Sequence, residues 1–224
     1  AFEAFARSGV QFGIVETGLG GRWDATNVLR PVLSVLTSIG MDHAAALGDT
    51  LEKIAAEKFE IVKEGVPVVS ADYPDSLMEA LAEKTRRCGS AWARASERVR
   101  IRVADRADDG QKLDVETADG PWGVVRLPLL GRHQVENAAL AVCSMETLRD
   151  RYGVDAPVER LKAGLQSVRW NGRTQWLRRE PDVMVDSAHN PAGAAALSAT
   201  LKTIRGRRPV GLVLGFMRDK DARG

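Results

Sequence analysis

Short apolar runs that end in turn-forming residues alternate with longer stretches of helical period, and this alternation restricts the chain to few folds. Apolar runs at residues 9–17, 31–40 and 66–71 indicate buried strands. Helices are expected over residues 50–64, capped by Asp49 or Thr50, and over residues 74–88. Strands that alternate with helices in this way favour a mostly parallel α/β sheet.

The pattern of apolar and turn-forming residues changes after residue 90. Short β-prone stretches separated by turn-formers over residues 91–130 predict antiparallel hairpins attached to the α/β core. Two helices are expected next, and then the α/β rhythm returns. The expected elements are helices at 131–149, 158–168 and 192–204 and strands at 174–179, 182–188 and 209–216. We therefore predict a large domain over residues 1–170 and the start of a smaller one over residues 171–224.

Composition excludes several classes of protein. The formal net charge is +2, from 32 basic and 30 acidic residues, which favours neither nucleic acid nor an anionic membrane as a partner. No apolar run approaches a membrane span of roughly 18 residues, and the start lacks the layout of a signal peptide. Cys88 and Cys143 fall in segments of helical pattern, which favours a structural role and agrees with a reducing cytoplasm.

Polar residues follow two of the expected parallel strands, where open α/β sheets place their ligands. Glu16 ends the first strand and leads into a loop that contains Gly18, Gly20 and Gly21. Asp42 and His43 follow the second strand and should emerge at the same edge of the sheet. A loop of this kind also fits an ordinary turn between a strand and a helix.

Three further segments carry chemistry-bearing residues, although each also fits a purely structural reading. Lys58 lies in a helical stretch, and Asn137 lies in the first turns of another helix, after His133 and Gln134. Asp186 ends a strand, and the turn that contains His189 leads into a helix, which suits contact with an anion. The chain has three histidines, and each falls in a separate candidate motif. This distribution favours an active site without naming a reaction.

These motifs together resemble the dihydrofolate synthase/folylpolyglutamate synthase family, within the wider Mur ligase group. The blocks that carry the resemblance are, in order, VETGLGGRWDATNV, IGMDH, LGDTLEKIAAEK, GRHQVENA, RWNGRTQ, DSAHNP and the terminal DKD. The first is the most specific, because Mur ligases of cell-wall synthesis do not usually carry the GLGGRxDATN loop. The resemblance implies a P-loop-type, mostly parallel sheet with an antiparallel β addition, followed by a smaller Rossmann-like α/β domain.

The resemblance also implies a reaction. ATP phosphorylates a pterin-linked carboxylate, and the amine of L-glutamate attacks the resulting acyl phosphate to form an amide. Glu16 and His43 resemble ligands of Mg²⁺, and Lys58 resembles a lysine that is carbamylated and holds a second Mg²⁺. Carboxylate and carbamate oxygens suit this ion, whereas imidazole is a less typical ligand. The family implies a monomer whose substrates are L-glutamate and dihydropteroate or folates.

The remaining implied site residues bind the nucleotide or approach the acyl phosphate when two domains close. Asn137 resembles a residue that contacts adenine, whereas Arg173, Asp186 and His189 resemble groups of the C-terminal domain. Asp186 and His189 are expected to take part in both nucleotide binding and catalysis, and His43 and Lys58 are expected to be catalytic as well as metal ligands. Closure of this type would exclude water from an intermediate that hydrolyses readily.

The sequence departs from the family pattern in several places. The family's phosphate-binding loop and pterin-binding segment belong upstream of Ala1, so we expect this chain alone to be inactive. Phe59 and Glu60 follow Lys58 where the family tends to have Ala-Gly, and Ser187 replaces a common glycine. Two alternatives stay open, namely a Mur-type ligase acting on a cell-wall precursor and a nucleotide-binding module without catalysis.

Overall fold

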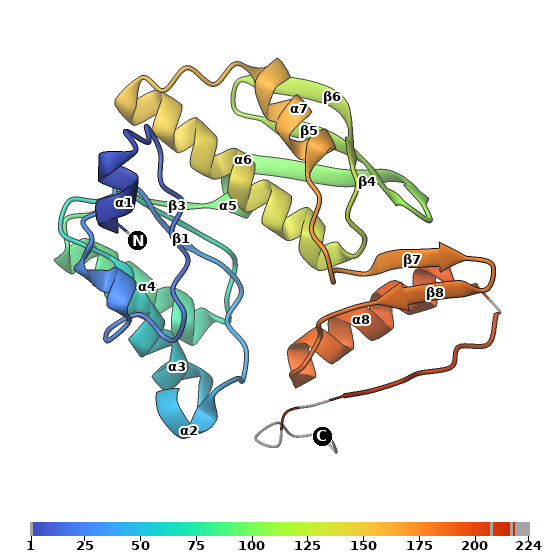
Figure 1. The fold of residues 1–224 in the computed structure, drawn as a ribbon. Helices are drawn as coiled ribbons and strands as arrows, with labels where there is room; N and C mark the ends of the chain where they lie inside the picture. Colours follow the sequence, from blue (N-terminus) through green and yellow to red (C-terminus); the bar gives the residue numbers. More distant parts are fainter. Residues whose placement is uncertain (1, 207, 216, 218–224) are drawn as a thin grey trace.

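Three short parallel strands form the first sheet of the protein (Figure 1). The structure, a computed structural model, describes residues 2–206, 208–215 and 217. The sheet has the strand order β1-β2-β3, with β1 at Ser34–Leu36, β2 at Val68–Ser70 and β3 at Trp92–Arg94. The central strand β2 is buried along its whole length, so it is apolar in sequence apart from Ser70.

Helices cover both faces of this sheet. Val68 points to one face and packs in a core with residues of α3 (Leu51–Lys58), the 3₁₀ turn η2 (Phe59–Ile61) and α4 (Asp75–Arg87). Its neighbour Val69 points to the opposite face and joins a second core that includes α6 (Arg132–Tyr152). Successive residues of a strand face opposite sides, so one strand connects the two cores.

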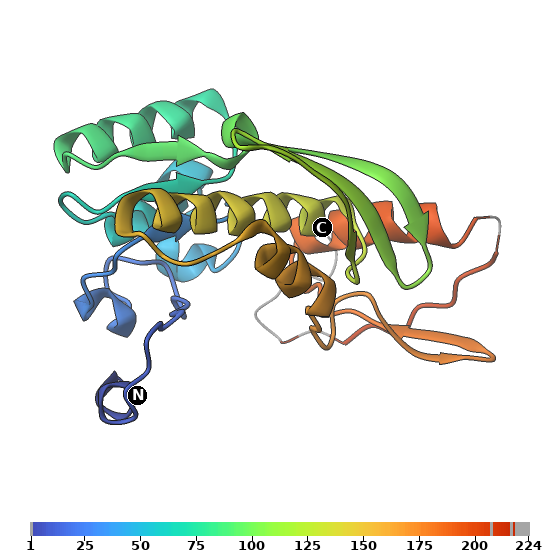
Figure 2. The same cartoon turned by 90° about the horizontal axis from the view of Figure 1, so that it is seen from above.

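An antiparallel sheet continues the second core. Strands β4 (Val99–Ala107), β5 (Gly110–Thr117) and β6 (Gly120–Leu127) form a meander, and their inward residues Leu113, Val115 and Val125 are fully buried. Helix α6 contacts both β2 and β4, and α7 (Val158–Ser167) lies against β6. Figure 2 shows α6 running along both sheets. The prediction of antiparallel hairpins on an α/β core is therefore confirmed.

The C-terminal part contains a two-stranded antiparallel sheet and one helix. Its elements are β7 (Gln175–Arg179), β8 (Asp182–Val185) and α8 (Pro191–Ile204). Helix α8 contacts α6, so the C-terminal part lies beside the start of that long helix (Figure 1). The other described elements are α1 (Phe2–Arg7), η1 (Ala25–Val28), α2 (Ala44–Leu47) and α5 (Ala95–Arg98). Among the described residues, no helix is both long and apolar enough to cross a membrane.

Two predicted strands are wrong. Residues 9–17 form no strand, and Ile14 in their middle is fully exposed. Residues 209–215 also form no strand, and Val213 is fully exposed. An extended segment needs a neighbouring strand to satisfy its N–H and C=O groups, and no strand of the described chain pairs with either one. The predicted strand at 31–40 is present but reduced to β1.

Candidate active site

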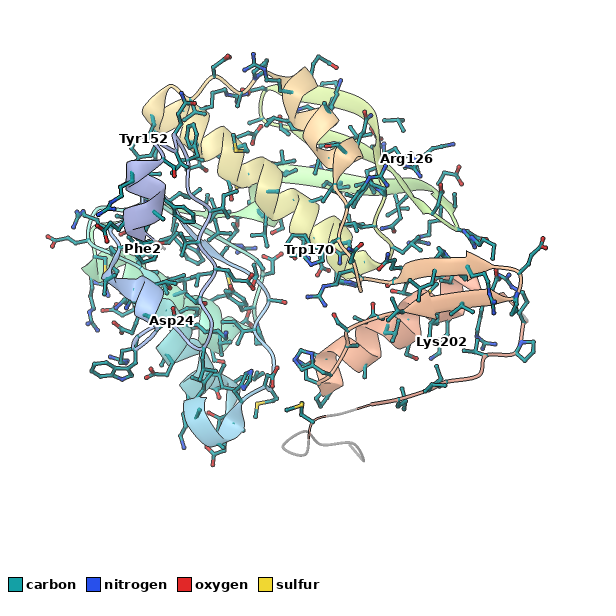
Figure 3. All side chains as sticks on the ribbon, viewed as in Figure 1. Phe2, Asp24, Arg126, Tyr152, Trp170 and Lys202 are labelled. Carbon is teal, nitrogen blue, oxygen red and sulfur yellow. The ribbon has the colours of Figure 1, made fainter. Side chains whose placement is uncertain are left out.

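The glycine-rich loop after Glu16 is held in shape by one carboxylate. Asp24 accepts hydrogen bonds from the N–H groups of Gly18 and Leu19 at 2.8 and 2.9 Å through one oxygen. Its other oxygen accepts from the Thr26 backbone at 2.9 Å and from the Thr26 hydroxyl. These bonds, chiefly those of Thr26 and then Leu19, lower the pKa of Asp24 to about 2. These hydrogen bonds fix the shape of the loop around Asp24, which is labelled in Figure 3.

The loop lies directly on the end of α3 that carries Lys58. The N–H of Arg22 donates to the carbonyl of Glu57 at 3.0 Å. A Cβ added to Gly21 would lie 2.7 Å from that carbonyl oxygen and 3.0 Å from the carbonyl oxygen of Lys58. Only glycine allows this approach of two backbones. The glycine-rich loop and the helix that carries Lys58, which belong to separate sequence motifs, are therefore in direct contact.

Phe59 and Glu60, the departures beside Lys58, have clear structural roles. Phe59 is 3% exposed and packs with Tyr73, their ring centroids being 6.0 Å apart. Glu60 lies 2.9 Å from the ammonium group of Lys84 and 3.5 Å from Arg22 of the glycine-rich loop. Partial burial alone would raise the pKa of Glu60, but these basic neighbours lower it. Both side chains therefore stabilise the surroundings of Lys58, which itself is half-buried.

The predicted metal ligands lie in three separate segments of the described chain. Glu16 is exposed just before the glycine-rich loop, and His43 is the N-cap of α2 and has a left-handed conformation with φ of 52°. No hydrogen bond or ion pair links Glu16, His43 and Lys58 within the described chain. Across all residues that the structure describes, no group of three His, Cys, Asp or Glu side chains is placed to hold a metal ion. The assignment of these three residues to Mg²⁺ stays a prediction.

Asp186 organises the start of the C-terminal part. One of its oxygens accepts hydrogen bonds from the N–H and the hydroxyl of Thr174, and the other accepts from the N–H of Ala188 at 2.8 Å. Arg173 precedes Thr174 and is exposed. Ser187, in the place of the usual glycine, donates its N–H to the carbonyl of Gly172 at 2.9 Å. Asp186 therefore fixes the two segments that carry Arg173 and His189.

Arg173 and Asp186 of the C-terminal part lie near His133 at the start of α6. Burial is the main cause of the lowered pKa of His133, and the positive charge of Arg173 adds to it. The negative charges of Asp186 and Glu136 act on the same imidazole in the opposite direction. Asn137 is exposed one turn further along α6, and its amide donates to Gln134 at 3.3 Å. Residues far apart in sequence thus surround the same region.

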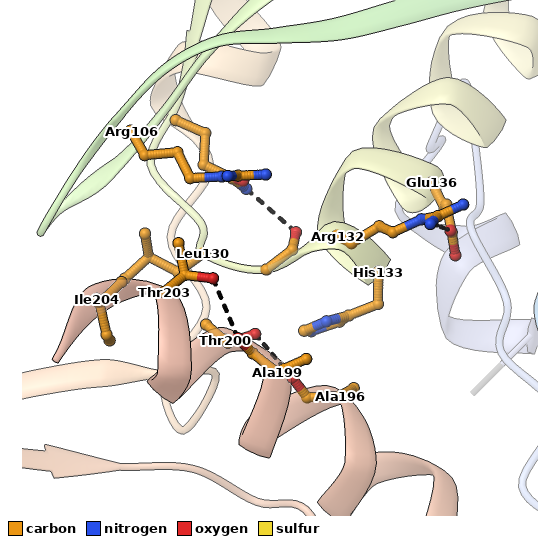
Figure 4. A pocket seen from close by; sticks show the side chains of 12 residues that line it. Arg106, Leu130, Arg132, His133, Glu136, Ala196, Ala199, Thr200, Thr203 and Ile204 are labelled. Carbon is orange, nitrogen blue, oxygen red and sulfur yellow. Dashed lines mark hydrogen bonds and ion pairs between the residues drawn. The ribbon is translucent and has the colours of Figure 1, made fainter. Parts of the chain in front are cut away.

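A cavity of about 290 Å³ lies where the C-terminal part meets α6 (Figure 4). His133 of α6 points toward Thr200 of α8 across it. Within the described structure, the buried Nδ1 atom of His133 has no hydrogen-bond partner. Gly131, with φ of 103°, brings the backbone so close that an added Cβ would lie 2.6 Å from the Thr200 hydroxyl. The two parts are therefore in close contact at Gly131 and Thr200, and the cavity lies beside this contact.

Comparison with known proteins shows which family this chain belongs to. The Mur ligase middle domain family matches residues 1–145, and the Mur ligase glutamate ligase domain matches residues 172–224. The chain belongs to the Mur ligase family. This agrees with the sequence-based recognition and with the mixed α/β fold.

Individual relatives of this Mur ligase chain are folate enzymes by name. The dihydrofolate synthase/folylpolyglutamate synthase of Bacillus subtilis is 35% identical over 211 residues, which cover 94% of this chain and 49% of the relative. The solved folylpolyglutamate synthase of Mycobacterium tuberculosis with ADP and AMPPCP is 36% identical, with a TM-score of 0.80, and the match covers 89% and 46% of the two chains. A solved FPGS–AMPPCP–folate complex is 32% identical with a TM-score of 0.86, covering 89% and 49%. The chain spans about half the length of the relatives that it matches.

Sequence reasoning missed two residues of this site. Thr174 adopts a positive φ of 47° and is buried against Asp186, which no sequence signal indicated. Asn190 precedes Pro191 at a helix start, a typical capping position. Its Oδ1 does accept from the N–H of Gly193 at 2.8 Å. Its amide nitrogen, however, binds Asp42, a residue 148 positions away, and no local pattern predicts such a contact.

Proposed function

We propose that this chain belongs to an ATP-dependent ligase that joins L-glutamate to dihydropteroate, to reduced folates or to both. The observation that carries the proposal is the similarity to relatives named for this chemistry, which extends across both parts of the chain. Relatives solved with AMPPCP, ADP and folate add support for a nucleotide and a folate as ligands. Within this chain, the C-terminal part contacts α6, the helix that carries Asn137.

The proposed reaction has two steps. The terminal phosphoryl group of ATP passes to the pterin-linked carboxylate and gives an acyl phosphate and ADP. The amine of L-glutamate then attacks the acyl carbon, loses a proton and expels phosphate, so that an amide forms. Such chemistry depends on positioning and on charge neutralisation. It also requires exclusion of water, which contact between the two parts of the chain would provide.

Each predicted residue has a place in this proposal. Asn137 on α6 would contact the adenine ring, and Arg173 would approach the nucleotide from the C-terminal part. Asp186 and His189 lie on the turn that enters α8, next to the middle part. Since Asp186 is already occupied by three hydrogen bonds, its contribution would be to hold this turn in place.

Magnesium would neutralise the charge of the ATP phosphates. The donors present fit an ion that is held mainly by phosphates and water, because this ion often takes only one or two protein carboxylates. Glu16 and His43 would supply such contacts, and a carbamylated Lys58 would supply a further anionic oxygen. Glu16 is exposed beside the ordered glycine-rich loop, as a residue with this role requires.

The proposal includes the setting of the protein. Residues 1–170 would form the ATP-binding middle domain and residues 171–224 part of the glutamate ligase domain. The protein would act as a monomer in the cytoplasm, on small molecules rather than on nucleic acid or membranes. Its near-balanced charge supports the last point.

One experiment separates this proposal from its alternatives. Phosphate release by the full-length protein is measured with ATP, Mg²⁺ and L-glutamate, and dihydropteroate or tetrahydrofolate is added in turn. Release that requires both L-glutamate and a pterin supports the folate ligase, and the active pterin names the substrate. Release that requires a cell-wall nucleotide precursor instead would indicate another Mur-type ligase. ATP binding without release under any of these conditions would indicate a non-catalytic module.

A further inference from the structure

Asp42 connects the two parts of the chain. It lies in the loop after β1, and its Oδ2 accepts a hydrogen bond at 2.9 Å from the amide nitrogen of Asn190, the N-cap of α8. The Nε2 atom of His189 lies 3.4 Å from the same oxygen. The Nε2 atom of His43 lies 3.8 Å from the other oxygen. One carboxylate thus stands between histidines that belong to different domains.

The orientation of the Asn190 amide is determined by its surroundings. Its oxygen accepts from the N–H of Gly193 at 2.8 Å, and its nitrogen faces the carboxylate of Asp42. A flipped amide would set its NH₂ group against an N–H donor and its oxygen against an anion, and both contacts would be repulsive. The cap of α8 and the bond to Asp42 are therefore made by one rigid group.

The loop that carries Asp42 is shaped to receive α8. A Cβ added to Gly40 would lie 3.3 Å from the Cβ of Ala192, in the first turn of the helix. The carboxylate also faces the N-terminal end of a 14-residue helix, where a negative charge is favourable. Shape and charge thus agree with the hydrogen bond.

A second contact holds the C-terminal part at β7. The indole N–H of Trp176 donates to the carbonyl of Asp108 in the β4–β5 turn. The guanidinium of Arg179 lies over the Trp176 ring, 4.0 Å from its centroid, and 3.3 Å from the Asp108 carboxylate. Because this contact does not involve the start of α8, the Asp42 bond can be lost while the two parts stay attached.

We propose that Asp42 is a positioning residue, which latches α8 to the middle domain through Asn190 and so sets His189 and Asp186 against the active site. The latch is the hydrogen bond between Asp42 and Asn190. Its proposed effect on catalysis rests on the proposed function. The substitution Asn190→Ser removes this bond alone, because serine still caps a helix but is too short to reach Asp42. The substitution Asn190→Asp also keeps the cap and places a second carboxylate against Asp42.

The first test measures the distance between the two parts. Spin labels are attached after Glu79→Cys on α4 and Lys202→Cys on α8, two exposed positions, in a Cys88→Ser background (Figure 3 labels Lys202). We expect one narrow distance distribution for the parent and for the control Asp49→Asn, whose carboxylate forms an exposed ion pair with Lys53 in α3. Asn190→Ser should broaden the distribution, and Asn190→Asp should shift it to longer distances.

The reciprocal pair Asp42→Asn with Asn190→Asp should restore the parent distribution. Parent-like distances in both single variants of Asn190 would overturn the latch.

The second test measures kcat and KM in the full-length ligase. Asn190→Asp should lower kcat by about 10-fold and leave the KM for ATP within about threefold, because a latch acts on the closed state and not on initial binding. The reciprocal pair should recover kcat to within about threefold of the parent. Changed distances in a protein without ligase activity would support the latch and refute the proposed function. An unchanged kcat in an active ligase would refute the catalytic role of the latch.

Discussion

The Asp186 carboxylate holds Thr174 by two hydrogen bonds, at 2.7 Å from its backbone N–H and at 3.1 Å from its hydroxyl. Thr174 is 4% exposed and has a φ of 47°, which is unfavourable for a β-branched residue. The conformation persists because the surrounding bonds fix it. The turn into α8 is therefore maintained by Asp186 rather than by local preference.

Replacing this carboxylate with an amide should destabilise the protein. Both oxygens of Asp186 accept from backbone N–H groups, so either orientation of the amide in Asp186→Asn sets an NH₂ group against a donor. We expect a loss of about 1–3 kcal/mol, or roughly 3–10 °C in the melting temperature. Thermal unfolding measures it. The control Asp155→Asn, at an exposed ion pair, should melt within about 1 °C of the parent. Equal melting of both variants would contradict the role of Asp186.

The aromatic residue after Lys58 should be essential for stability. Phe59 is buried in the core between α3 and α4, and Phe59→Ala would leave a cavity there. The expected loss in the free energy of unfolding is about 3–5 kcal/mol. Phe12, which is 62% exposed, offers a matched control, and Phe12→Ala should change stability by less than about 0.5 kcal/mol. Urea unfolding compares the two. Similar losses would show that Phe59 is not a core residue.

The loop carboxylate Asp24 should make part of the stability depend on acid. Its pKa in the folded protein is about 2, below the ordinary value of 3.8, because the charged form accepts the hydrogen bonds of the loop. Because the pKa is lower in the folded protein than in the unfolded chain, this stabilisation is complete at a pH above the pKa of the unfolded chain. It is lost as the pH falls toward 2. The difference in stability between the parent and Asp24→Asn should thus be constant above about pH 5 and narrow below pH 4. Urea unfolding between pH 3 and pH 7 gives this difference, and a gap that does not change with pH would contradict the assignment.

The elements that were predicted correctly depend on local sequence. Thr50 caps α3 through the N–H of Lys53, as its position before a helical stretch indicates. The hairpins β4–β6 likewise follow from turn residues and alternation. Residues 9–17 and 209–215 carry equally apolar patterns and form no strand, because a strand also needs a partner that the pattern cannot specify.

The same distinction applies to the candidate site. Glu16, His43 and Lys58 were selected from motifs, and the structure explains the placement of Lys58 through the close approach of Gly21 to α3. The bond between Asp42 and Asn190 joins residues 148 positions apart, so it arises only from the packing of two domains. The terminal DKD motif lies outside the described residues, and its role stays a prediction.

Carbamylation of Lys58 is the most specific chemical prediction for this chain. The ammonium group would first lose a proton, and the free amine nitrogen would then bond to the carbon of CO₂ and lose a second proton, so that a cation becomes an anion. We expect ¹³C-labelled CO₂ to give a carbamate resonance in the parent protein that is absent from Lys58→Arg. Lys53 on the same helix is exposed and paired with Asp49, so Lys53→Arg should keep the resonance. In the full-length protein, Lys58→Arg should lower kcat by about 100-fold or more, because removing one charge-stabilising group from an active site costs about that factor. A resonance that survives in Lys58→Arg, or full activity of that variant, would show that Lys58 is an ordinary lysine of α3.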